Sequence, residues 1–202
     1  MDTRYAYLGI GVVMLLAILA FVNPSFMRGR DTDTSGTIRN SSATSTMTLS
    51  LTSPAFGEGA SIPSQFTCDG NQKSPPLAIS GAPDVTKSFA IIVEDPDVPK
   101  VLKPDGVFLH WVVFNLPGGP ALQLEEGTAL GVSGQNGAGQ NGYKGPCPPA
   151  EYMPNEHRYV FTLYAIDSML SLSEGASKED VLHAMQGHIL EQAQLMGKYK
   201  RK

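Results

Sequence analysis

The sequence predicts a mainly β domain, a β-rich sandwich with one helix late in the chain. The first observation is composition: the 202 residues include 21 Gly and 15 Pro but only 2 Cys, which is typical of many strands and loops. The second is a set of three segments, 88–95, 108–116 and 157–166, rich in Val, Ile, Phe, Tyr and Trp and bounded by Pro or Gly. The third is a helical pattern that begins at Ser177. A helical bundle, a coiled coil and a disulfide-dense scaffold fit this chain poorly.

The first element in the chain is an apolar stretch. Residues 5–22 contain no charged side chain, and as a helix they would be about 27 Å long, close to the thickness of a bilayer's hydrocarbon core. We expect residues 1–23 to be a membrane anchor. Cleavage as a signal peptide is the main alternative, because Ala17 and Ala20 are three residues apart. A buried core helix is the third interpretation.

A polar segment separates this stretch from the rest of the chain. Residues 24–48 are rich in Ser, Thr, Asp and Gly and have little apolar periodicity, so we expect a disordered tether. Residues 49–202 then have the usual length of one folded domain. We expect this domain to be extracytoplasmic, either anchored or secreted after cleavage. Arg4 on one side of the apolar stretch and Arg28 and Arg30 on the other leave the orientation of an anchor open.

The three predicted strands bring polar residues to one edge of a sheet. Two of them are near-continuously apolar, as in a sheet covered on both faces. If 88–95 and 108–116 pair antiparallel, the end of the first and the start of the second lie at the same edge. Asp95 closes the first strand and His110 stands near the start of the second. His157 opens the third, and Tyr159 follows on the same face because side chains alternate with period two.

The last element is predicted to be a helix that runs from Ser177 to Gly197. Ser177 is the expected N-cap and Asp180 occupies the capping-box position. The expected buried face is Val181, Met185, Ile189, Gln192 and Met196, with Gly197 as the stop.

Two imidazoles, a carboxylate and a phenol at one edge are compatible with several chemistries. They can hold a phosphate or carboxylate anion, with the acid orienting an imidazole. They match a metal-binding facial triad in number, although no H-x-x-x-H or H-x-H pair supports a metal site. Cys147 beside His157 could act as a thiolate nucleophile in a hydrolase. Each His could also be only a satisfied, partly buried residue.

Net charge argues against one class of partner. Lys and Arg total 15 against 19 Asp and Glu, and a net charge of -4 provides no broad cationic surface for nucleic acid. We predict no nucleic-acid partner and no cofactor.

Six segments together resemble one known family. They are C-D-G-N-Q-K-S-P-P-L (68–77), D-P-D-V-P (95–99), H-W-V-V-F-N-L-P (110–117), G-Y-K-G-P-C-P-P (142–149), H-R-Y-V-F-T-L-Y (157–164) and G-H-I-L-E-Q-A-Q-L-M-G-K-Y (187–199). In this order they resemble the phosphatidylethanolamine-binding protein family, and more specifically its bacterial and archaeal Raf kinase inhibitor-like branch.

This resemblance implies a large central antiparallel sheet packed on a smaller sheet, with a shallow anion pocket at one end. Its members are generally regarded as binding modules for phospholipid head groups or other small anions, and several inhibit kinases or serine proteases. The residues that the resemblance assigns to ligand binding are Asp95, His110, Tyr143, Gly145, Pro148, Pro149, His157 and Tyr159.

Both cysteines fall in loop segments of the domain. As the only pair in a chain with an export-like N-terminus, Cys68 and Cys147 are expected to form a disulfide that clamps the segment 142–149 to an earlier loop. Two buried free thiols are the alternative. Our leading hypothesis is a membrane-tethered anion-binding domain without turnover. The second is an inhibitor that engages a protease or kinase through loops 96–106 and 143–154.

Overall fold

The computed structural model describes residues 48–201. The predicted anchor and all but the last residue of the predicted tether lie outside the described residues, so both stay predictions. Between residues 48 and 201, no helix is long and apolar enough to cross a membrane.

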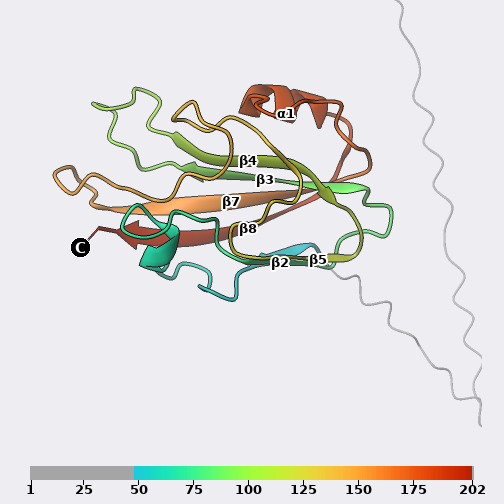
Figure 1. Cartoon of the computed structure of the whole chain (residues 1–202), viewed down its shortest axis with the longest axis horizontal. Coiled ribbons are helices and arrows are strands. Elements are labelled where there is room, and N and C mark those ends of the chain that lie inside the picture. Colours follow the sequence, from blue (N-terminus) through green and yellow to red (C-terminus); the bar gives the residue numbers. More distant parts are fainter. Residues whose placement is uncertain (1–47, 202) are drawn as a thin grey trace, which may run out of the picture. The chain divides into compact units, whose positions relative to one another are not determined.

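The described chain forms two antiparallel sheets and one α-helix (Figure 1). The larger sheet has the strand order β6-β4-β3-β7-β8 and the smaller one the order β1-β2-β5. The mainly β fold with a large and a small sheet is thereby confirmed. In chain order the elements are β1 (Ser50–Thr52), the 3-10 turn η1 (Ser64–Phe66), β2 (Leu77–Ser80), β3 (Ser88–Asp95), β4 (Phe108–Pro117), β5 (Ala121–Leu124), β6 (Val132–Ser133), β7 (Glu156–Ile166), α1 (Lys178–Ala184) and β8 (Ile189–Lys200).

The three strands expected from the sequence are the central strands of the larger sheet. β3 matches the prediction, and β4 and β7 each extend it by one residue. β3 pairs antiparallel with both β4 and β7, so the end of β3 and the starts of β4 and β7 lie at one edge. This arrangement brings the predicted polar residues together.

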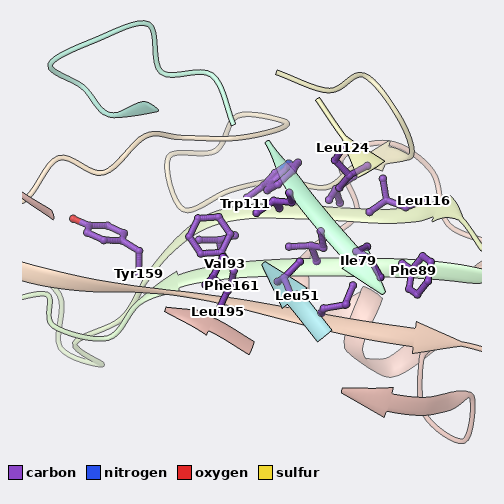
Figure 2. Packing of buried hydrophobic residues seen from close by; sticks show 14 of the residues in the cluster. Leu51, Ile79, Phe89, Val93, Trp111, Leu116, Leu124, Tyr159, Phe161 and Leu195 are labelled. Carbon is purple, nitrogen blue, oxygen red and sulfur yellow. The ribbon is translucent and has the colours of Figure 1, made fainter. Parts of the chain in front are cut away.

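The larger sheet is covered on both faces because its strands are apolar on both sides. Alternate residues such as Phe89, Val93 and Phe161 pack between the two sheets (Figure 2). The intervening residues, including Ile92 and Val112, pack under α1. In Figure 1, α1 lies over one face of the larger sheet and β2 and β5 over the other. This explains the near-continuous apolar runs of β3 and β4.

The predicted helix from Ser177 to Gly197 is correct only in its first part. Ser177 caps α1, and its side chain and that of Asp180 form the expected capping box. The helix ends at Ala184, however, and Gly187 adopts a φ of 79° in the turn that follows. Glycine adopts this left-handed conformation without steric cost, so Gly187 reverses the chain where the prediction placed a helix interior.

The rest of that segment is the edge strand β8. Its residues Leu195, Gly197 and Tyr199 are buried, which is the period-two alternation of a strand. A Cβ added to Gly197 would lie 2.6 Å from Cγ1 of Ile62 and 2.8 Å from Cε2 of Phe56. Gly197 is therefore a close-packing position in a strand, and the prediction that it stops a helix is wrong.

Candidate functional site

The layer between the sheets becomes polar where β3 ends. Along most of its length, the face of the larger sheet that packs on the smaller sheet buries apolar side chains. At the edge where β3 ends, the same face carries Asp95, His110 and His157, and all three are buried. They border a cavity of about 150 Å³. Its lining residues are Asp95, Val98, Phe108, His110, Lys144, Gly145, Cys147, Pro148, Pro149 and His157.

Asp95 is fixed by the turn that follows β3. Its Oδ1 accepts a hydrogen bond from the backbone N–H of Asp97, 2.8 Å away. Asp97 in turn accepts from the backbone N–H, Nε and Nη2 of Arg158 on β7. These hydrogen bonds to Arg158 hold the pKa of Asp97 below its usual range. The turn is thereby tied to the neighbouring strand, which holds Asp95 at the mouth of the inter-sheet layer.

His110 faces the pocket because β4 contains an irregularity. Val93 pairs with Trp111 and Glu94 pairs with Leu109, so His110 is an extra residue between two ladder positions. Such a bulge changes the direction of a side chain and is common beside functional sites. In a regular strand, the neighbours His110 and Trp111 would point to opposite faces of the sheet. Here Trp111 packs in the layer between the two sheets and His110 lines the pocket at the end of that layer.

Asp95 and His157 form a buried pair. Nδ1 of His157 lies 2.7 Å from Oδ2 of Asp95, and Nε2 lies 3.0 Å from the carbonyl oxygen of Pro154. Burial raises the pKa of Asp95, and the hydrogen bond from His157 opposes that rise. Both partners of the imidazole are acceptors, so the doubly protonated ring would donate to each of them.

The second imidazole is held by the segment after β6. Nδ1 of His110 lies 2.6 Å from the carbonyl oxygen of Lys144, and the backbone N–H of Lys144 donates to the carbonyl oxygen of His110. Burial lowers the pKa of His110 to about 4, although the hydrogen bond to Lys144 works in the opposite direction. At neutral pH the ring is therefore uncharged.

The two predicted tyrosines lie beside the pocket and do not line it. The hydroxyl of Tyr143 donates to the carbonyl oxygen of Phe66 at 3.1 Å, and its ring packs edge-on against Trp111. Tyr159 packs edge-on against His110, with ring centroids 5.1 Å apart. Figure 2 shows Tyr159 at one end of the row of core side chains with its hydroxyl pointing away from them. That hydroxyl has no hydrogen-bond partner among residues 48–201.

Residues 142–149 contribute one wall of the pocket, and a disulfide joins this wall to an earlier loop. Cys68 and Cys147 are bridged, with Cα atoms 5.4 Å apart, as predicted. The backbone N–H of Cys68 also donates to the carbonyl oxygen of Pro146. A Cβ on Gly145 would lie 2.8 Å from the carbonyl oxygen of Phe66, so only glycine allows the wall to approach this closely. The hypothesis of a Cys147 nucleophile is wrong, because its sulfur is bonded to Cys68.

The structure adds residues to the pocket that sequence reasoning missed. Val98, Phe108 and Lys144 line it together with the predicted residues. Phe108 lies in the predicted strand 108–116 and Lys144 in the segment 142–149, but nothing in their residue types indicated a role in the pocket. In the described part of the chain, no group of three or more His, Cys, Asp or Glu is placed to hold a metal ion.

A larger hollow of about 600 Å³ lies beside α1, on the other face of the larger sheet. Its charged residues largely neutralise one another, since Lys178 pairs with Glu94 at 2.8 Å and Lys103 pairs with Asp105. The smaller cavity has the buried ionisable groups, so we take it as the candidate site.

Two antiparallel sheets with a small pocket around a His–carboxylate pair at one end define the class of this protein as a β sandwich with a polar pocket at its edge. The family profile described as "Phosphatidylethanolamine-binding protein" matches residues 52–200. The chain belongs to the phosphatidylethanolamine-binding protein family, as the resemblance implied.

Relatives from bacteria and archaea support this membership. A UPF0098 protein of Chlamydia pneumoniae is 44% identical over 153 residues, which cover 76% of this chain and 99% of the relative. A UPF0098 protein of Methanothermobacter thermautotrophicus is 45% identical over 162 residues, again covering 76% of this chain and 99% of the relative.

Two solved structures with the same fold come from bacteria. A phosphatidylethanolamine-binding protein homologue from Chlamydia trachomatis is 45% identical, has a TM-score of 0.70, and matches over 77% of this chain and 99% of its own. YbcL of Escherichia coli, described as a member of the mammalian family, is 28% identical with a TM-score of 0.66, over 76% of this chain and 99% of its own.

Proposed function

We propose that this protein is a binding module without turnover that holds a small phosphate-type or carboxylate anion in the pocket at the end of β3. One observation carries the proposal: buried Asp95, His110 and His157 converge on a cavity of about 150 Å³. A cavity of this size has room for a small head group. Family membership supports binding as the general activity.

Donors for such an anion come from the pocket wall. The backbone N–H groups of Gly145 and Cys147 donate to no other group within residues 48–201, and both residues line the cavity. Two backbone N–H groups close in sequence can form a concave anion site. Lys144 also lines the cavity, and its positive charge acts on His110.

We also propose that the domain works outside the cytoplasm, tethered through residues 5–22. The bridge between Cys68 and Cys147 supports this location, since structural disulfides persist mainly in oxidising compartments. Protease treatment of intact cells would test it: digestion of the domain is expected, and full protection would contradict the proposal.

Calorimetric titration with phosphoethanolamine tests the pocket. Wild-type protein is expected to bind, and His110→Ala is expected to bind at least about tenfold more weakly because the variant removes a pocket side chain with a buried hydrogen bond. His188→Ala is the matched control, since His188 is exposed and pairs with Asp167 away from the pocket. Absence of wild-type binding, or equal binding by His110→Ala, would overturn the assignment.

A second candidate function is inhibition of a protease or kinase through the loops around the pocket. The observation that favours it is the exposure of large apolar side chains on these loops: Val101 and Met153 are 78% and 77% exposed, and Leu102 is 50% exposed. Inhibition that survives His110→Ala but is lost in Val101→Asp would support this function, because the loop surface would then act without the pocket. Loss in His110→Ala alone would contradict it.

A further inference from the structure

The two pocket imidazoles differ in how many ring nitrogens they leave available to bind a ligand. Both ring nitrogens of His157 are committed, one to the carboxylate of Asp95 and one to the carbonyl oxygen of Pro154. His110 uses only Nδ1, which faces the carbonyl oxygen of Lys144. Within residues 48–201, Nε2 of His110 is therefore the one pocket imidazole nitrogen without a protein partner.

The partner of Nδ1 decides the chemistry of Nε2. A carbonyl oxygen only accepts hydrogen bonds, so Nδ1 of His110 carries the hydrogen. The pKa of His110 is lowered to about 4 by burial, which keeps the ring uncharged at neutral pH. Nε2 then has a lone pair and no hydrogen. It can accept a hydrogen bond from a ligand, but it cannot donate one to an oxyanion.

The groups that face His110 from neighbouring elements do not change this state. β3 contributes the carboxylate of Asp95, and the segment after β6 contributes Lys144. β7 contributes His157 and the ring of Tyr159. The positive charge of Lys144 disfavours a further proton on His110, and a proton on His157 would act in the same direction. The free oxygen lone pairs of Asp95 are further acceptors.

We propose that the pocket selects oxyanions that carry an acidic hydrogen, such as a phosphate monoester monoanion, which donates that hydrogen to Nε2 of His110. The inference rests on the proposed anion-binding function and specifies its ligand class. A fully deprotonated oxyanion such as sulfate would place oxygen lone pairs against the lone pair of Nε2. A phosphate diester, the form found in an intact phospholipid, has no hydrogen to donate either.

Proton linkage follows from the same arrangement. A phosphate monoester loses its second proton near pH 6. Above that pH, the free ligand is a dianion, and forming the hydrogen-bonded complex takes up one proton from solution. Affinity should therefore fall by up to about tenfold per pH unit above pH 6, until the bound proton itself dissociates.

The test is calorimetric titration of the wild-type protein with methyl phosphate, dimethyl phosphate and sulfate at pH 6 and pH 8. At pH 6, about half of the methyl phosphate is a monoanion. Dimethyl phosphate matches the charge of this form and differs from it by a methyl group in place of the acidic hydrogen. We expect methyl phosphate to bind at least about tenfold more tightly than either other ligand, because unpaired buried polar groups penalise the analogue that lacks the hydrogen. At pH 8, titrations in buffers of different ionisation enthalpy should show uptake of about one proton.

His110→Gln provides a second arm, because its amide can donate as well as accept and does not titrate. The variant should bind sulfate and methyl phosphate with similar affinity and without proton uptake. Equal wild-type affinity for the three ligands, without proton uptake, would overturn this inference and leave anion binding intact. Failure of the wild-type protein to bind any of the three, or phosphoethanolamine, would overturn the proposed function itself.

Discussion

At the scale of the residue, one bulged position determines what the pocket can do. His110 is placed by the irregular pairing between β3 and β4, and its ring lies between Phe108 and Tyr159. It is 5% exposed, so a positive charge on it would be poorly solvated. The cost of burying that charge is small at neutral pH, where the ring is uncharged, and becomes significant in acid.

The first prediction is therefore acid sensitivity that depends on His110. Its pKa is about 4 in the folded protein and 6.5 in the unfolded chain. The unfolded chain binds a proton that the folded protein excludes, so stability present above pH 6.5 is lost as the pH falls toward 4. At about 1.4 kcal/mol for each pH unit, the loss reaches up to about 3 kcal/mol.

Urea denaturation at pH 7.5 and pH 4.5 measures this loss. His110→Gln should lose less stability between the two pH values than the wild-type protein. His188→Gln, at an exposed position, should behave like the wild type. An equal acid-induced loss in wild type and His110→Gln would contradict the prediction.

At the scale of the element, the sequence predicted strands better than it predicted the end of the chain. The runs in β3, β4 and β7 were recognisable because both of their faces are apolar and Pro or Gly bounds them. The helix was overextended because the spacing of Ile189, Gln192 and Met196 also fits a helical face. The alternation Leu195, Gly197, Tyr199 was the competing signal, and tertiary pairing with β7 decides in its favour.

Gly197 gives a test of this strand assignment. Gly197→Ala should lower the free energy of unfolding by about 1–3 kcal/mol, because the added methyl would overlap Ile62 and Phe56. In a helix, the same change would stabilise the protein by about 1 kcal/mol. Gly57→Ala is the matched control, since no atom lies within 4 Å of the Cβ position there. Stabilisation by Gly197→Ala, measured by urea denaturation, would contradict the strand packing.

At the scale of the whole molecule, the site joins segments that are far apart in the sequence. Strand ends and antiparallel pairing were sufficient to predict that Asp95, His110 and His157 meet at one edge. The bulge that turns His110, the commitment of both His157 nitrogens, and the pocket lining by Val98 depend on tertiary geometry that no local pattern encodes. The bridge between Cys68 and Cys147 was predictable because the chain has only these two cysteines.

That bridge links the stability of the domain to the shape of the pocket. It joins residues 79 apart, and in a chain-entropy account a loop of this length is worth about 4.5 kcal/mol. Reduction, or the double variant Cys68→Ala/Cys147→Ala, should lower the free energy of unfolding by about 2–4 kcal/mol.

Loss of the bridge should also weaken anion binding, because the wall that contains Gly145 and Pro148 would be held to the earlier loop only by the hydrogen bonds of Tyr143 and Cys68. Urea denaturation and phosphoethanolamine titration, each with and without reductant, measure the two effects. The double variant should show no further change on adding reductant, which controls for effects elsewhere in the molecule. A drop in stability with unchanged affinity would show that those two hydrogen bonds are sufficient to hold the wall, and would contradict the proposed link between bridge and pocket.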